Sequence, residues 1–462
     1  MEKKNLITSK LFTLAYENHK KNNFKEAEKI YKEIIRKDSN HLEANFCLGL
    51  IFLRIRDVPS LHHAKELFEK TIKINPNYAP AHNNLGQILQ ELGENKKAMK
   101  CFEKTIKIQP GLAAPYNNLG NLLLDVGENT KAVRCFERAI KIQPNLFAAH
   151  NNLGTVFGLM KKYDKAINCF KNAINLNYKH SMSHYNLGKA YKDSKNYSDA
   201  IKCFQIANTK RSRAEMLESI YFHSGVKNFL EILEKLSKED PLNLRVATMA
   251  AYVSEKEKVD NSYPFCKNPL EFVFTKNLKK EINEPNKFLN SLSKVLEMFD
   301  LTWQPATKST TNGYHTSGNL FNNKDQILVK FQNLIKKQIN EYKNFYKSSN
   351  DYFIKHWPEK NEIEAWHVRL KKGGYQKSHI HPAGWLSGCF YLKIPKILKD
   401  NQGAIKFTFT GYDYPEDKIL PELVHVPQAF DIALFPSSLF HQTIPFSSQE
   451  ERHVIAFDLM PK

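Results

Sequence analysis

The sequence predicts a multidomain α + β protein. We expect an N-terminal α-helical superhelix, followed by a C-terminal β-barrel or jelly roll with supporting helices. Two observations predict this division: a 34-residue period in the first half, and short strand-like runs in the last part of the chain. Periods of this length are typical of stacked helix pairs. Short apolar runs separated by turn residues are typical of small barrels.

The first half repeats a four-residue motif, NNLG or YNLG, at constant spacing. Glycine, alanine and phenylalanine positions all recur every 34 residues. These sets are Gly86, Gly120, Gly154 and Gly188; Ala98, Ala132, Ala166 and Ala200; and Phe102, Phe136, Phe170 and Phe204. Pro76, Pro110 and Pro144 end their units. The pattern resembles the tetratricopeptide repeat, in which two antiparallel helices carry Leu-Gly, then Ala, with Pro at the exit.

Two weaker units precede these four. Gly49 lies 37 residues before Gly86, and Ala15 lies 34 residues before Gly49, each directly after a leucine. We therefore predict about six repeats over residues 8–210. Such arrays form a superhelix with a concave face that suits extended peptides or partner helices. The resemblance thus implies a protein or peptide partner.

One asparagine position recurs on the first helix of each strong unit. Its members are Asn84, Asn118, Asn152 and Asn186. A ladder of amides at this pitch can hydrogen-bond a peptide backbone, and it resembles the ladder in the repeats of the O-linked N-acetylglucosamine transferases. The alternative is that these side chains bridge helices within the array. The sequence leaves both interpretations open.

Composition narrows the class of protein and its partners. The chain has 462 residues, 42% of them hydrophobic, and a net charge of +20 from 68 Lys+Arg against 48 Asp+Glu. This content supports folded cores and excludes a disordered chain. A basic balance suits an acidic partner, but the lysines are spread over the helical half. Because no DNA or RNA motif appears, we expect no nucleic-acid partner.

The cysteines and the amino terminus indicate a soluble, cytoplasmic protein. Four of the seven cysteines follow the 34-residue period, which indicates a small buried hydrophobe rather than a disulfide framework. They are Cys101, Cys135, Cys169 and Cys203. The first residues lack the apolar run and cleavage site of a secretory signal. No stretch approaches the ~18 apolar residues of a membrane span.

The second half begins with a helical connector, predicted over 211–265, and then changes period. Residues 325–347 have apolar positions at helical spacing, which predicts one long amphipathic helix. Strand-like runs follow, including IEAWHVRL, GWLSGCFYLKI, GAIKFTF, DIALFPSS and RHVIAFDLM. We therefore predict a jelly-roll domain over 270–462.

Three histidines in this domain indicate a metal site. His379 and His381 are two residues apart, so in a strand they share one face. His441 lies at the end of a later apolar strand. Two ligands on one strand and a third on another make a facial arrangement that leaves metal positions open. Arg452 begins the next strand, where its guanidinium can bind a carboxylate as a fork.

This layout resembles the double-stranded β-helix oxygenases that use Fe(II) and 2-oxoglutarate. It is most similar to a bacterial and phage branch with five ordered elements, over roughly 290–462. Those elements are Gly373-Gly374 with His379 and His381-Pro382; Ser387-Gly388 with Tyr391-Leu392; Phe435-Pro436-Ser437; His441; and Arg452.

The resemblance implies a role for each of these side chains. His379 and His441 would bind iron, together with His381. Arg452 would hold the distal carboxylate of 2-oxoglutarate, and Tyr391 could hydrogen-bond a cosubstrate carboxylate or be structural. The implied activity is that of an iron-dependent dioxygenase, a hydroxylase of a protein or peptide held by the repeats, which consumes O2 and 2-oxoglutarate.

The sequence departs from the family pattern at His381, where most members have an aspartate. The missing carboxylate could be Asp400 or Asp413, or it could be absent. Three-histidine sites also occur in oxygenases that use no 2-oxoglutarate and in inert cupins. His367 and Arg369 share one strand face and could reach the pocket or be structural.

Two other classes of function therefore stay open. One is a repeat scaffold whose jelly roll binds a metal or ligand without turnover. The other is a three-histidine metal enzyme that does not use 2-oxoglutarate.

Overall fold

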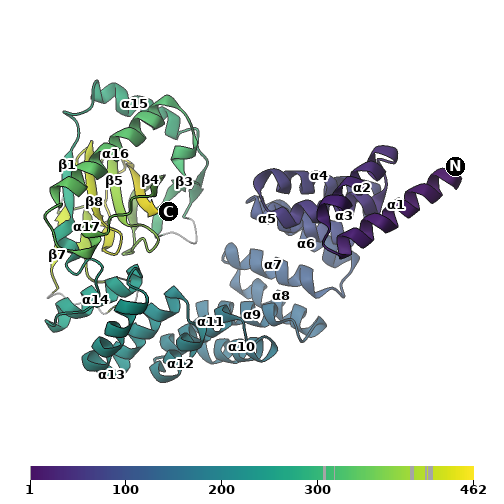
Figure 1. Cartoon of the computed structure of the whole chain (residues 1–462), viewed down its shortest axis with the longest axis horizontal. Helices are drawn as coiled ribbons and strands as arrows, with labels where there is room; N and C mark the ends of the chain where they lie inside the picture. Colours follow the sequence, from purple (N-terminus) through teal and green to yellow (C-terminus); the bar gives the residue numbers. More distant parts are fainter. Residues whose placement is uncertain (1, 305–308, 317, 396–399, 412–413, 415–419) are drawn as a thin grey trace. The chain divides into compact units, whose positions relative to one another are not determined.

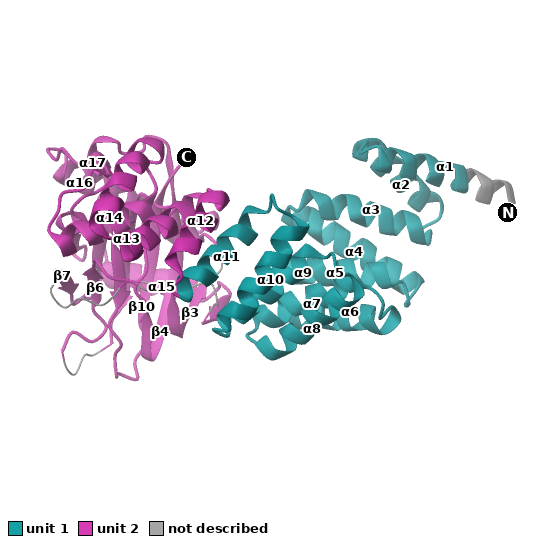
Figure 2. Ribbon diagram, turned by 90° about the horizontal axis from the view of Figure 1, so that it is seen from below, with its two compact units in different colours: residues 1–194 teal, residues 195–462 magenta. Residues whose placement is uncertain are grey.

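The computed structural model describes residues 2–304, 309–316, 318–395, 400–411, 414 and 420–462. The chain forms two compact units, Met1–Ser194 and Lys195–Lys462, which Figure 2 distinguishes by colour. We call them the repeat unit and the β unit. None of the helices in the described ranges is long and apolar enough to cross a bilayer.

The repeat unit consists of helices that pack in sequence order, each against the next (Figure 1). Their bounds are α1 (Glu2–Lys20), α2 (Phe24–Lys37), α3 (Leu42–Ile55), α4 (Val58–Ile74), α5 (Ala79–Glu91), α6 (Asn95–Ile108), α7 (Ala113–Asp125), α8 (Asn129–Ile142), α9 (Phe147–Leu159), α10 (Tyr163–Leu176) and α11 (Ser181–Asp193). The predicted helical superhelix is confirmed.

One contact recurs in four helix pairs, from α3 and α4 to α9 and α10. The glycine of the first helix lies against the phenylalanine of the second, so closely that a Cβ on Gly120 would be 2.6 Å from Cε1 of Phe136. The same relation holds for Gly86 with Phe102 and for Gly154 with Phe170. These phenylalanines are buried. A side chain on the glycine would separate the helices, because the interior is close-packed.

The β unit begins with helices α12 (Tyr197–Ala207), α13 (Lys210–Glu239) and α14 (Leu244–Glu257). The predicted connector thus belongs to the same compact unit as the β-rich part of the chain. Our domain boundaries of 8–210, 211–265 and 270–462 stay a prediction.

Two antiparallel sheets form the rest of this unit. One has seven strands in the order β1-β8-β5-β10-β4-β3-β2, and the other has three in the order β7-β6-β9. The strands are β1 (Phe274–Asn277), β2 (Leu301–Trp303), β3 (Thr310–Thr316), β4 (Asn361–Gln376), β5 (Leu386–Lys393), β6 (Ile405–Thr408), β7 (Glu422–His425), β8 (Asp431–Pro436), β9 (Phe440–Thr443) and β10 (Arg452–Pro461). The helices that precede or separate these strands are η1 (Pro269–Phe272), α15 (Pro285–Leu296), η2 (Leu320–Asn322), α16 (Gln326–Phe345) and α17 (Tyr352–Lys355).

The seven-stranded sheet buries both of its faces. On the outer face, Phe390 of β5 meets Phe331 of α16 with ring centroids 5.1 Å apart, and Figure 1 shows α16 running beside this sheet. On the inner face, Val454 and Ala456 of β10 join Phe407 of the smaller sheet in a separate apolar cluster. The predicted long helix is therefore the cover of the outer face, and the space between the sheets is the interior of the jelly roll.

Helix α9 allows a paired test of the glycine contact. Gly154→Ala should destabilise the repeat unit by about 1–3 kcal/mol because the new methyl group overlaps the Phe170 ring. Gly158→Ala, in the same helix, meets nothing within 4 Å and should stabilise by about 0.5–1 kcal/mol. Urea unfolding followed by circular dichroism measures both. Equal effects of the two substitutions would contradict the packing explanation.

Candidate metal centre

Three histidines from two parts of the β unit come together in the interior. His379 and His381 lie between β4 and β5, and His441 lies in β9. One ring nitrogen from each can be chosen so that all lie within 4.8 Å of one another. The ring centroids of His379 and His441 are 4.3 Å apart, and His381 lies 5.1 and 5.0 Å from them. The structure therefore brings the predicted triad together.

Backbone pairing holds the histidines in this arrangement. His379 and His441 form an isolated antiparallel bridge, in which each N–H donates to the other's carbonyl at 3.1 Å. The backbone N–H of His381 donates to the carbonyl of Ser437 at 3.0 Å. Residues that face each other across an antiparallel pair point to one side of the sheet. The bridge therefore sets two rings side by side, and the hydrogen bond to Ser437 holds the segment that carries the third.

The Nδ1 atom of each histidine has an oxygen within hydrogen-bond distance. For His379 it is the Lys377 carbonyl at 2.7 Å, and for His441 the Leu439 carbonyl at 3.2 Å. For His381 it is Oδ1 of Asp458 at 2.6 Å. Because carbonyl and carboxylate oxygens only accept, these contacts favour a proton on each Nδ1, which leaves Nε2 as the atom that can bind a metal. Ser309 Oγ lies 3.3 Å from Nε2 of His379.

The protonation state of His441 also suits a metal. Burial, followed by the neighbouring rings of His379 and His381, holds the pKa of His441 well below its usual range. His441 is therefore neutral near pH 7, which is the form that binds metal ions.

No carboxylate belongs to this cluster within the part of the chain that the structure describes. Asp400 is not among the grouped residues, and Asp413 lies outside the described ones. Three imidazole nitrogens are a ligand set for Fe(II), Zn(II), Cu(II) or Ni(II), and they leave coordination positions open.

Arg452 is one of the largest fully buried side chains of the protein. Its Nε donates to the Gly403 carbonyl at 3.0 Å, and its guanidinium carbon lies 5.1 Å from the centre of the Tyr391 ring. Among the described residues, no carboxylate lies within ion-pairing distance of it. A buried cation without an anion is costly.

Tyr391 lies on the inner face of β5 and is fully buried. Its hydroxyl makes no hydrogen bond of ordinary geometry with the residues described. Burial raises the pKa of Tyr391 above its usual range and lowers that of Arg452. The two side chains contact each other, but no carboxylate among the residues described balances the charge of Arg452.

His367 and Arg369 lie on the opposite face of β4 from the metal centre. Trp366 points inward, with its ring 5.5 Å from that of His381, so its neighbour His367 points outward. Arg369 pairs with Glu451 at 2.6 Å. Of the two interpretations that the sequence left open for this pair, the structural one fits.

The recurring asparagines make contacts between neighbouring repeats. Nδ2 of Asn118 donates to Oδ1 of Asn83 at 3.2 Å, and Asn152 donates in the same way to Asn117 at 3.1 Å. Asn186 repeats the bond with Asn151 at 3.2 Å. Asn84, the first of the set, is half-buried. The bridging alternative therefore accounts for one N–H of each of the last three, and peptide binding stays a prediction.

Sequence reasoning missed Asp458, although it had singled out the two serines beside it, Ser387 and Ser437, as motif positions. Asp458 accepts from Ser387 Oγ at 2.6 Å, and Ser387 lies 2.8 Å from Ser437 Oγ. Strand parity could have identified Asp458. It lies six positions after Arg452 in β10, so both side chains point to the same face of the sheet.

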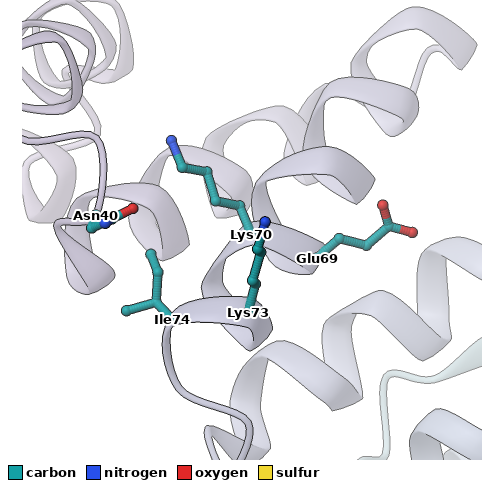
Figure 3. Close-up of a pocket in the computed structure, with 5 residues that line it drawn as sticks. All are labelled: Asn40, Glu69, Lys70, Lys73 and Ile74. Atoms are coloured by element: carbon teal, nitrogen blue, oxygen red, sulfur yellow. The ribbon is translucent and has the colours of Figure 1, made fainter.

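One surface hollow in the repeat unit is lined by Asn40, Glu69, Lys70, Lys73 and Ile74 (Figure 3). Its charged side chains extend from α4 and it contains no histidine or cysteine. It adds no candidate for catalysis.

Family comparisons agree with both halves of this description. Residues 79–112, 111–179 and 160–212 each match a tetratricopeptide repeat model. Residues 364–458 match the family described as "Putative 2OG-Fe(II) oxygenase". No curated protein matches the chain.

Similar solved structures cover the repeats. MamA is 24% identical and covers 36% of this chain and 96% of its own, with a TM-score of 0.33. PilF of Pseudomonas aeruginosa is 21% identical, over 46% of this chain and 96% of its own, with a TM-score of 0.40. YrrB, described as a TPR protein with an unusual peptide-binding site, is 17% identical over 42% and 96%, with a TM-score of 0.34.

The protein is thus a helical-repeat protein joined to a jelly roll with a three-histidine cluster. Its repeats match tetratricopeptide repeat models, and residues 364–458 of its β unit match the family model described as "Putative 2OG-Fe(II) oxygenase".

The buried His367 should make stability depend on pH. Burial, followed by the charges of His453, Arg369 and His315, lowers the pKa of His367 to about 3. Above pH 6.5 the imidazole is neutral in both folded and unfolded chains. As the pH falls from 6.5 towards 3, only the unfolded chain binds the proton, so stability falls.

We expect His367→Leu to remove about 2 kcal/mol of the stability loss between pH 7 and pH 5. Urea unfolding at both pH values measures it. The exposed His223→Leu is the control and should leave the slope unchanged. An unchanged slope in His367→Leu would show that this imidazole does titrate in the folded protein.

Proposed function

We propose that the protein is an Fe(II)- and 2-oxoglutarate-dependent dioxygenase that hydroxylates a protein or peptide held by its repeats. We place the repeat array at residues 8–210, the connector at 211–265 and the catalytic domain at 270–462. The observation that carries the proposal is a triad of Nε2 lone pairs in the same interior as a buried arginine that lacks an anion.

The residues present fit the metal. Nε2 of His379, His381 and His441 would hold Fe(II) through neutral imidazoles. With iron and 2-oxoglutarate bound, the site would supply oxidation by O2, coupled to decarboxylation of the keto acid to succinate. The protein's share is to fix the three rings before the metal arrives, through the backbone bridge and the three Nδ1 contacts.

The residues present also fit a dicarboxylate. The guanidinium of Arg452 and the hydroxyl of Tyr391 are buried donors without an anionic partner. The distal carboxylate of 2-oxoglutarate would supply that partner and accept from both. A charge-assisted hydrogen bond in a dry site is among the stronger polar contacts, so this pair can select an anionic cosubstrate over a neutral one.

The repeats supply the means of holding a protein substrate. Stacked helix pairs present an extended surface of the kind that other proteins bind. Because Asn118, Asn152 and Asn186 each use one amide N–H between repeats, their remaining N–H and their carbonyl oxygens would make the peptide contacts. Asn84 would join them at the start of the row.

Removing one ligand tests the metal. His441→Ala should lower 2-oxoglutarate-dependent succinate release to below about one hundredth of the wild-type rate, since loss of even a second-shell partner costs 10–100-fold. His425→Ala is the matched control, because His425 lies in the same unit but pairs with Asp431 at 3.1 Å. Full turnover in His441→Ala would reject the proposal, as would a purified protein without affinity for iron.

Removing the buried cation tests the cosubstrate. Arg452→Leu should raise the KM for 2-oxoglutarate by at least about 100-fold, because breaking a buried charge pair costs several kcal/mol. Arg369→Leu, on the outer face of β4 and paired with Glu451, should leave KM unchanged. Metal-dependent turnover that survives Arg452→Leu would point instead to a three-histidine enzyme that does not use 2-oxoglutarate.

A further inference from the structure

A second buried charge lies on the strand that carries Arg452. Asp458 is 8% exposed and points into the same interior. Its only basic partner among the described side chains is His381, because no lysine or arginine there lies within ion-pairing distance. Burying a carboxylate is expensive unless a cation or several donors balance it. We therefore expect a cation bound to His381 to balance the negative charge of Asp458.

Hydrogen bonds and close packing hold Asp458 in place. One oxygen, Oδ1, accepts from both His381 Nδ1 and Ser387 Oγ at 2.6 Å. The loop that carries His381 passes so close that a Cβ on Gly384 would lie 2.7 Å from Ser437 Oγ and 3.3 Å from Asp458 Cγ. The loop, the serines and the carboxylate thus form one packed arrangement behind the imidazole.

His381 differs from the other two histidines in its acceptor. His379 and His441 each face a neutral backbone carbonyl, whereas His381 faces a carboxylate. A carboxylate behind a ligating histidine fixes the tautomer and the ring orientation, and it makes the ligand nitrogen more basic. A neutral carbonyl, which carries no full charge, has a weaker effect on the orientation and the basicity of the ring.

We propose that Asp458 is the carboxylate of this metal centre, placed one shell out as the positioning residue of His381. The inference rests on the proposed function for the presence of the metal. In this arrangement His381 occupies the position of the ligand, and Asp458 supplies the negative charge through the imidazole. The chain thereby keeps a carboxylate at the centre without a direct carboxylate ligand.

Co(II) binding to the full-length protein tests the proposal without turnover. The visible absorption of Co(II) reports coordination, and a competing chelator gives the affinity. Asp458→Ala should weaken Co(II) binding by about 10–100-fold. Asp458→Asn keeps an acceptor oxygen but loses the charge, so it should lose less affinity than the alanine variant, and it serves if alanine prevents folding.

Asp431→Ala is the matched control. Asp431 is also a buried aspartate of the β unit that contacts a histidine, His425, at 3.1 Å, but it has no contact with the triad. Both alanine variants should lower the melting temperature, and only Asp458→Ala should weaken Co(II) binding. This difference separates a role at the metal from a merely structural one.

Two results would overturn the proposal. Wild-type Co(II) affinity in both Asp458 variants would remove any role at the metal. A loss in Asp458→Ala as large as that in His441→Ala would make Asp458 a direct ligand instead. If the wild type binds Co(II) but Fe(II) and 2-oxoglutarate together give no charge-transfer band, the dioxygenase proposal fails while the Asp458 result stands.

Discussion

The candidate site depends on one backbone pairing, the reciprocal bridge between His379 and His441. His379 follows a strand of the larger sheet, and His441 belongs to the smaller one. Without the bridge, nothing local in the sequence would hold these rings within 4.3 Å of each other. Once it forms, His381 lies only two residues beyond the bridge, and the carbonyl of Ser437 accepts its backbone N–H and fixes this segment. A pair of main-chain hydrogen bonds therefore sets the geometry on which the side-chain chemistry rests.

The interior between the sheets is apolar except at its functional side chains. Tyr391, Arg452 and Asp458 lie among residues such as Ala433, Phe435 and Val454. In such surroundings, unbalanced charges cost stability, and the fold retains two of them. A ligand that binds only the folded state would recover that cost by mass action. Metal and dicarboxylate would then act as stabilisers of the β unit as well as reactants, which links occupancy of the site to the stability of the fold.

The sequence was most informative where a single period controls the structure. The 34-residue spacing predicted the helix pairs, because it returns the same glycine and phenylalanine to each unit, and Gly120 and Phe136 pack closely within theirs. The sequence placed His379 and His381 on one strand, but the structure has only an isolated bridge at His379; the triad was still predicted correctly, because two residues at i and i+2 of an extended segment share a face. Which face of β4 points inward could not be read from parity, so the position of His367 stayed open. Asp458 was missed because its partner, His381, is distant in sequence, and only the pairing of β10 with β5 brings them together.

The departure at His381 can be understood through the charge of the whole site. In the proposed complex, Fe(II) brings two positive charges and 2-oxoglutarate two negative ones. Arg452 adds one positive charge, and Asp458 adds one negative charge through His381. The sum is neutral, as it would be if the carboxylate bound the metal directly and the third histidine were absent. In a site of low dielectric constant, an unbalanced net charge is costly, whichever residue binds the metal directly. In the proposed site, the carboxylate behind His381 would compensate for a histidine at the ligand position where an aspartate is expected. In this view, His381 and Asp458 act as one functional unit: the histidine binds the metal and the aspartate supplies the negative charge.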